Sequence, residues 1–320
     1  MATWAIVPVN VLVIVAGFVV TFVHVPLLRR ATWFGDLLVL ALPLGCIALV
    51  VLGIVLLAIR VPTSIVAATG GVFAGCVAHC ALPRQRVAAP PPAAPVLLVS
   101  VNLQYDSADP RATVRSALDA RPDVLVACEV TTVTEALLRA AFPYHLVSQD
   151  ALRINDNAVG IYSHLPFEEL APLPPLGREA LRIRVNGPHP FVLCAVHLPR
   201  PVIVHDGSTG LASMAEHRRA VHRLDDAVRA EVEPVVLIGD LNLSDRTVGY
   251  RVLTAGRLDA MRTTCALSTY TGSWRWRVLM FRIDHCVIPA DWGVADAGTF
   301  TIEGSDHRGI RAKIGPALER

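Results

Sequence analysis

The stretch VVLIGDLNLSD at residues 235–245 decides the fold of this chain. Four aliphatic residues are followed at once by a glycine and an aspartate, and an asparagine comes two residues after the aspartate. A short apolar run bounded by turn residues is typical of a buried strand in a layered α/β protein. Because the polar residues come directly after this run, we predict that Asp240 and Asn242 lie at the exposed edge of a sheet, where α/β proteins commonly place their chemistry.

The same arrangement recurs between about 96 and 317. Short β-branched runs alternate there with helical stretches, which predicts a mixed α/β domain whose sheet surfaces are covered by helices. Each polar residue next to such a run is common by itself in a buried strand or a helix cap. Their joint order indicates a site, and its members are Asn102, Glu129, His197, Asp240, Asn242, Asp284, Asp306 and His307.

These residues lie in segments that resemble the endonuclease/exonuclease/phosphatase superfamily, the deoxyribonuclease-I-like phosphoesterases. The matching segments are VNLQY (101–105), DVLVACEV (123–130), NAVGIYSHLPF (157–167), AVHL (195–198), GDLNLSD (239–245), RIDHCVI (282–288) and GSDHRGI (304–310). The resemblance implies an α/β fold, a four-layer sandwich of two packed sheets flanked by helices. Since one fold hosts many activities, function still has to be argued from the site.

The resemblance also implies a metal-dependent reaction. Glu129 is expected to hold Mg²⁺ or Mn²⁺, because hard cations prefer carboxylate oxygens to thiol or imidazole ligands. Asn102 and Asp306 are expected to help hold or orient the metal. The ion would polarise a phosphoryl oxygen and neutralise the leaving group.

Five further residues are expected to carry the catalysis that the resemblance implies. Asp240 would orient and activate the attacking water, and Asn242 would bond the phosphoryl oxygens as charge builds. His307, oriented by Asp284, would stabilise the charge of the transition state. His197 would contact the phosphate from the other side and share the general-acid work.

Substrate contacts are expected at Asn157, before a predicted strand, and at Arg275 and Arg277 in the segment TGSWRWRVLMF (271–281). Guanidinium groups bind phosphate well, and the interleaved tryptophans suit an interface. A turn residue and an ordinary strand or loop are equally good interpretations of these positions. His285 adjoins Asp284 on one predicted strand, so its side chain should face the other way and have a structural role.

The N-terminal third differs in composition from the rest of the chain. Three uncharged runs, at about 5–25, 37–59 and 63–82, each reach the roughly 20 residues that cross a bilayer as a helix. They predict a bundle of three transmembrane helices, an anchor at 1–82. A Pro/Ala-rich linker at 83–95 and a catalytic domain at 96–320 would follow.

The predicted location is therefore the cell membrane, in a multi-pass arrangement whose orientation stays open. Four arginines (Arg29, Arg30, Arg84 and Arg86) would share one side and Arg60 the other, so the positive-inside rule places the catalytic domain in the cytoplasm. The anchor and domain together resemble the bacterial VanJ-type membrane proteins of teicoplanin resistance. That resemblance implies the opposite side, and we prefer an extracytoplasmic domain slightly.

Composition separates the candidate functions. Residues after position 95 contain 24 Lys and Arg against 26 Asp and Glu, which is a net charge of −2 and makes a nucleic-acid partner unlikely. We expect a membrane-anchored hydrolase of a lipid-linked phosphate or pyrophosphate, with the bilayer and this lipid as partners. The alternatives are a membrane-tethered nuclease and a non-catalytic binding or sensor module.

Overall fold

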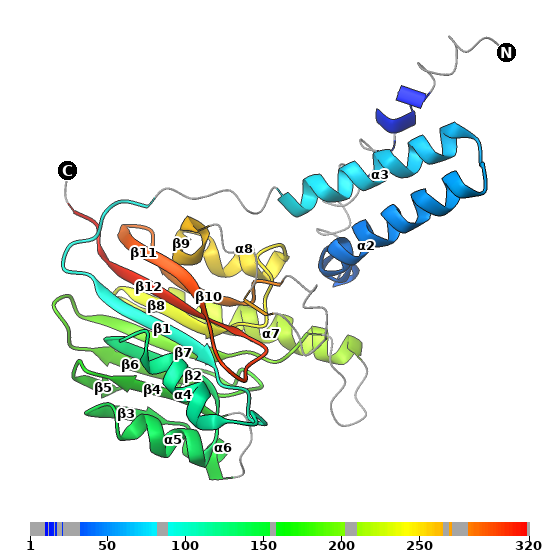
Figure 1. Ribbon diagram of the computed structural model, residues 1–320. Coiled ribbons are helices and arrows are strands. Elements are labelled where there is room, and N and C mark those ends of the chain that lie inside the picture. Colours follow the sequence, from blue (N-terminus) through cyan, green and yellow to red (C-terminus); the bar gives the residue numbers. More distant parts are fainter. Residues whose placement is uncertain are drawn as a thin grey trace. The chain divides into compact units, whose positions relative to one another are not determined.

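The computed structural model describes residues 33–81, 89–153, 158–201, 210–264, 269–270 and 281–318, with single positions between 10 and 21. It divides into two compact units. One comprises residues 1–85 with 246–248, and the other comprises 86–245 with 249–320. Figure 1 traces the chain through both units.

The first unit contains helices α2 (Trp33–Ala58) and α3 (Thr63–Ala81). Proline at position 62 precedes α3, where its missing N–H costs no helical hydrogen bond. A Cβ atom at Gly71 of α3 would overlap the carbonyl oxygen of Ile14, so only glycine allows this close approach. Gly71 therefore serves the packing of α3 in this unit.

The structure corrects the prediction of membrane-spanning helices. In the part of the chain that it describes, no helix is both long and apolar enough to cross a bilayer.

The multi-pass membrane location and the transmembrane bundle were predicted from these runs, and both are corrected by the same finding. The first predicted span, at about 5–25, lies largely outside the described residues, as does the first part of the predicted linker at 83–95.

The second unit contains two six-stranded mixed sheets. The first sheet is built from β1 (Val96–Asn102), β2 (Val124–Val130), β3 (Tyr144–Val147), β4 (Ala158–Ser163), β11 (Trp292–Thr301) and β12 (Arg308–Pro316), in the order β11-β12-β1-β2-β4-β3. The second is built from β5 (Phe167–Glu169), β6 (Ala180–Val185), β7 (Phe191–His197), β8 (Val235–Asp240), β9 (Arg257–Asp259) and β10 (Asp284–Pro289), in the order β5-β6-β7-β8-β10-β9.

Helices cover the outer faces of both sheets. They are α4 (Pro110–Leu118), α5 (Thr132–Arg139), α6 (Gln149–Arg153), α7 (Gly210–Arg229) and α8 (Val248–Thr254), with a 3₁₀ turn η3 at Ala260–Thr263. Local sequence sets where they begin: Asp109 caps the first amides of α4, and Thr131 forms a capping box with Thr134 at α5. Figure 1 shows α4 and α5 beside the first sheet.

Successive side chains along each strand point to opposite faces of its sheet, and the apolar ones form three layers. Leu98 of β1 and Val126 of β2 face Leu193 and Ile238 of the second sheet in the core between the sheets. Their neighbours on the other face pack under α4 and α5, and the outer face of the second sheet packs under α7. The predicted sandwich of two packed sheets flanked by helices is therefore confirmed for this unit.

The strand directions bring the predicted site together. β1 runs parallel to β2, and β7 runs parallel to β8. β10 is antiparallel to β8, with Asp284 paired to Asp240, so it begins where β8 ends. The carboxyl ends of four strands and the start of a fifth therefore carry the polar residues that follow the apolar runs.

Candidate active site

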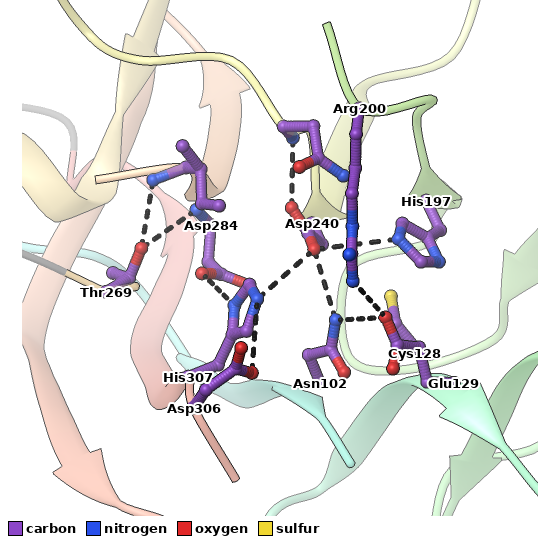
Figure 2. Close-up of polar contacts among 12 residues, drawn as sticks. Asn102, Cys128, Glu129, His197, Arg200, Asp240, Thr269, Asp284, Asp306 and His307 are labelled. Carbon is purple, nitrogen blue, oxygen red and sulfur yellow. Dashed lines mark hydrogen bonds and ion pairs between the residues drawn. The ribbon is translucent and has the colours of Figure 1, made fainter. Parts of the chain in front are cut away.

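Polar side chains from both sheets converge at this edge (Figure 2). The structure brings together all eight members of the predicted set: Asn102, Glu129, His197, Asp240, Asn242, Asp284, Asp306 and His307. Asn157, Arg275 and Arg277, predicted to contact substrate, lie outside the described residues. Figure 2 shows Asp240 in the middle, with His307 and His197 on opposite sides of it.

Gly239 sets the position of Asp240. It pairs with Val196 of β7 and has φ +144°, a backbone conformation that favours glycine. A Cβ atom there would overlap the carbonyl oxygen of Val196. The glycine of the GD pair therefore lets β8 approach β7 closely enough to place Asp240 beside His197.

The loop after β8 holds one oxygen of Asp240. The backbone N–H of Asn242 donates to Oδ1 of Asp240 at 2.9 Å, and Nδ2 of Asn242 donates to the carbonyl of Leu198 at 2.9 Å. Asn242 has φ +46°, a strained value for a residue other than glycine. The surrounding structure maintains such a backbone conformation at a site. With Oδ1 held by Asn242, the second oxygen of Asp240 faces the centre of the site.

His307 and Asp284 form a buried pair. Nδ1 of His307 lies 2.9 Å from Oδ2 of Asp284, and both side chains are almost fully buried. Thr269 fixes the strand start by accepting from the N–H groups of Ile283 and Asp284. Burial by itself lowers the pKa of His307, but the charges of Asp284 and Asp240 outweigh it and raise this pKa to about 10. The imidazole is therefore positively charged at neutral pH.

Oδ2 of Asp240 faces three groups. It lies 3.2 Å from Nδ2 of Asn102, 3.7 Å from Nε2 of His307 and 3.6 Å from Nε2 of His197. Burial raises the pKa of Asp240 to about 6, while the charge of His307 opposes this rise. Asp240 is therefore an ionised carboxylate at neutral pH, with a proton affinity suited to a general base.

His197 is neutral. A guanidinium nitrogen of Arg178 donates toward its ring and lies 2.8 Å from Nε2 and 3.4 Å from Nδ1. Burial, followed by the charge of Arg178, lowers the pKa of His197 well below its usual value. The arrangement therefore favours a hydrogen-bonding contact over the general-acid role that the resemblance implied.

Glu129 is presented by an irregular stretch of strand. The pairing of β2 with β4 shifts register between Ala127 and Val130, and Glu129 has φ +57°. An irregularity of this kind interrupts the alternation of a strand and redirects a side chain. Glu129 is 2% exposed, and its Oε2 accepts from the N–H of Tyr105 at 3.2 Å.

Oε1 of Glu129 has two further partners. Asn102 donates to it from Nδ2 at 3.1 Å, and Arg200 donates from a guanidinium nitrogen at 3.3 Å. The amide oxygen of Asn102 accepts from the N–H of Gln104 at 3.0 Å. Asn102 therefore orients the carboxylates of Glu129 and Asp240, and its oxygen faces away from them.

The residues on the Glu129 side fit a divalent cation. Burial, together with the nearby charge of Glu129, raises the pKa of Asp306, so the two carboxylates repel one another. A guanidinium lies against Glu129 where such repulsion would attract a positive charge. Oxygen donors in this arrangement suit Mg²⁺ or Mn²⁺, with Glu129 and Asp306 as the residues that would hold it.

A second cluster, Asp240, Asp284 and His307, brings its ligand atoms within 4.8 Å of one another. The charged ring of His307 faces both carboxylates there and already offsets part of their charge. A cation is therefore better placed on the Glu129 side.

Sequence reasoning missed two members of the site. Arg178 precedes β6, and Arg200 lies in the loop after β7, three residues beyond His197. No local pattern identifies them, because their contribution depends on the folded position of two loops. The structural role expected for His285 agrees with its contacts: it bonds Asp259 at 3.0 Å and the carbonyl of Leu243 at 2.7 Å.

Solved structures share this fold. An endonuclease/exonuclease/phosphatase from Beutenbergia cavernae DSM 12333 is 21% identical, with a TM-score of 0.53 over 70% of this chain and 72% of that one. The Neisseria 3′ phosphatase NExo bound to a product DNA hairpin is 18% identical, with a TM-score of 0.52 over 68% and 98%. D. rerio TDP2 complexed with a single-strand DNA product is 18% identical, with a TM-score of 0.53 over 70% and 100%. No curated protein matches this chain.

The sequence itself assigns the family. The model of the Endonuclease/Exonuclease/phosphatase family matches residues 99–307, which include the whole set of converging side chains. The enzymes of this family are metal-dependent hydrolases of phosphoric esters, in agreement with the carboxylate-rich site. The chain belongs to the Endonuclease/Exonuclease/phosphatase family.

Proposed function

We propose that this enzyme hydrolyses a phosphoric ester by in-line attack of a water molecule at the Asp240–His307 centre. The observation that carries the proposal is the placement of Oδ2 of Asp240, which faces the charged ring of His307 at 3.7 Å while Oδ1 is held by the loop. An ionised carboxylate whose second oxygen faces the centre of the site can orient a water molecule and accept its proton. The positively charged ring of His307 beside it can stabilise the negative charge that builds on the phosphoryl oxygens.

The other residues divide the remaining work. Asp284 keeps His307 protonated and fixes its ring. Nδ2 of Asn242, which donates to the carbonyl of Leu198, would bond a phosphoryl oxygen as charge builds on it. His197, neutral and paired with Arg178, would contact the phosphate from the opposite side. Glu129 and Asp306 would hold Mg²⁺ or Mn²⁺, which when bound polarises the phosphoryl group and neutralises the leaving oxygen.

The substrate is the part of the proposal that depends least on the site. The sequence predicted a lipid-linked phosphate or pyrophosphate, and the support from membrane-spanning helices is withdrawn with those helices. The net charge of −2 after position 95 still supports a substrate other than a polynucleotide, and Lys313 is the one lysine of the chain. We therefore keep the lipid-linked ester as the first substrate to test.

A second candidate, hydrolysis of nucleic-acid phosphodiesters or of a DNA 3′ phosphate, is supported by a different observation. Two proteins of the same fold, Neisseria NExo and D. rerio TDP2, are described with product DNA in their structures. At 18% identity this likeness concerns the fold, so it makes nucleic acid a candidate substrate.

One experiment tests both candidates. Phosphate release from an undecaprenyl-pyrophosphate-type lipid is measured with Mg²⁺, beside nicking of plasmid DNA and release of phosphate from a 3′-phosphorylated oligonucleotide. His307→Ala, Asp240→Ala and Glu129→Ala serve as blanks, and each should lose turnover on the true substrate. Lipid turnover lost in all three supports the first candidate, and DNA turnover alone supports the second. Turnover that persists in His307→Ala contradicts the proposed centre.

A further inference from the structure

Arg200 places a positive charge on Glu129, the carboxylate that we expect to hold a metal. Its guanidinium donates to Oε1 of Glu129 at 3.3 Å. Figure 2 shows its extended side chain passing Asp240 on the way to Glu129. A divalent cation bound to Glu129 would therefore compete with the guanidinium of Arg200 for the same carboxylate.

The backbone of Arg200 is fixed by its neighbours. The carbonyl of Arg200 accepts from Oγ of Ser213 on α7. Two residues earlier, the N–H of Leu198 donates to the carbonyl of Asp240 at 3.0 Å, and its own carbonyl accepts from Asn242. The loop that bears Arg200 is therefore bound to the same loop that bears Asp240.

The two partners of the ion pair differ in freedom. The side chain of Glu129 is 2% exposed and has three hydrogen-bond donors around it, whereas the side chain of Arg200 is 32% exposed. A long, partly solvated arginine can turn about its side-chain torsions while its backbone stays in place. Arg200 is therefore the partner that moves when the pair separates.

The surroundings of Arg200 are those of a phosphate-binding residue. Its guanidinium lies 3.3 Å from Glu129, and Figure 2 shows its side chain between those of Asp240 and His197. Arginine offers several donors in a planar group that matches phosphate oxygens. When the guanidinium of Arg200 leaves Glu129, the same side chain would reach a phosphoryl group bound at the centre.

We propose that Arg200 is an exchangeable cation: it neutralises Glu129 while no metal is bound, and it turns to the phosphoryl group of the substrate when a divalent metal takes its place. This inference rests on the proposed function, because it deepens the role of the same centre. It makes Arg200 a substrate-binding residue whose contact with Glu129 opposes metal binding. A merely structural ion pair would instead hold Glu129 in position for the metal.

The test uses two binding measurements that need no turnover. Mn²⁺ affinity of the full chain is measured by electron paramagnetic resonance, and the affinity of the Mn²⁺-loaded protein for inorganic phosphate is measured by calorimetry. Arg200→Gln should bind Mn²⁺ about three- to tenfold more tightly, because a partly screened opposing charge is removed. The same variant should bind phosphate weaker by a similar factor, while Arg200→Lys stays closer to the wild type in Mn²⁺ affinity.

Arg178→Gln is the matched control, because it removes an arginine of the same site that pairs with His197 and not with Glu129. It should weaken phosphate binding without the gain in Mn²⁺ affinity. Unchanged or weaker Mn²⁺ binding in Arg200→Gln would overturn the inference, and so would an equal gain in Arg178→Gln. Since neither measurement requires hydrolysis, opposite shifts in an inactive protein would uphold the inference and reject only the proposed function.

Discussion

Asp284 and His307 join the two sheets of the sandwich through a single contact of 2.9 Å between Oδ2 and Nδ1. Asp284 begins β10 in the second sheet, and His307 immediately precedes β12 in the first. Asn102 of the first sheet reaches Asp240 of the second in the same way, at 3.2 Å. The site therefore forms only when the two sheets are packed face to face, so its geometry reports on the whole core.

Replacing Asp284 by Asn tests what this contact contributes. The amide keeps the size of the side chain but removes the charge that raises the pKa of His307. We expect kcat to fall by about 10²- to 10⁴-fold, the range of a positioned acid–base or charged group, while circular dichroism keeps the folded spectrum. Steady-state kinetics with saturating metal measures this, and a kcat within twofold of the wild type would exclude His307 as the stabilising cation.

The pH dependence of turnover follows from the two central groups. Asp240, with a pKa of about 6, must lose its proton to act as a base, so activity should rise through that pH. His307, with a pKa of about 10, must keep its proton, so activity should fall as pH passes that value. Profiles of kcat/KM against pH at several Mn²⁺ concentrations test this. A nearby cation favours the ionised carboxylate of Asp240, so added Mn²⁺ should move the rise in activity to lower pH. A profile that is flat between pH 5 and 7 at low metal would contradict the role of Asp240.

Much of this site was predictable from the sequence because each member adjoins an apolar strand. Asp240 follows VVLIG, and Glu129 lies inside VLVACEV, so strand ends and motif order together placed them at one sheet edge. Alternation also predicted that His285 and Asp284 face opposite ways. The structure gives His285 its own partner, Asp259, on the far side from the site.

Other features depend on tertiary contacts that leave no local pattern. Arg178 and Arg200 reach the site from loops, and the ten residues of β11 (Trp292–Thr301) include glycine, aspartate and alanine without alternation. β11 forms by pairing with β12 at the edge of the first sheet. The prediction of three transmembrane helices was wrong, because no helix among the described residues is long and apolar enough to cross a bilayer.

The buried pair of His285 and Asp259 should make stability depend on pH. Burial alone lowers the pKa of His285, but Asp259 outweighs this and raises it, so the stabilisation is complete below the unfolded value of about 6.5 and is lost as pH rises through the folded pKa. The pKa of Asp259 is lowered by His285 despite its burial, so its contribution is present above about 3.9 and is lost as pH falls through its folded pKa. The pair should therefore stabilise most between about pH 4 and 6.5.

Urea unfolding of Asp259→Asn and the wild type across pH 4 to 9 measures this window. Asp259→Asn leaves His285 buried without a negatively charged partner. We therefore expect the free energy of unfolding to fall by about 3 to 5 kcal/mol near pH 6, with a smaller difference toward pH 9. Tyr250→Phe is the control, because it removes the neutral hydrogen bond from the Tyr250 hydroxyl to Asp259 and keeps both charges of the pair, so it should cost about 1 kcal/mol at every pH. An Asp259→Asn loss that stays constant across the range would show that the pair is not charged.

Gly239 should be the least replaceable glycine of the sandwich. A methyl group there would overlap the carbonyl of Val196, so Gly239→Ala must push β8 away from β7 and displace Asp240 from His197. Gly256 provides the matched control: it also has a positive φ, +75°, but no atom lies within 4 Å of the position of an added Cβ. Gly256→Ala should cost only the backbone strain of about 1 to 2 kcal/mol, with kcat unchanged. Gly239→Ala should cost clearly more by urea unfolding and lose turnover at the same time, and equal stability losses in the two variants would show that β7 and β8 tolerate separation.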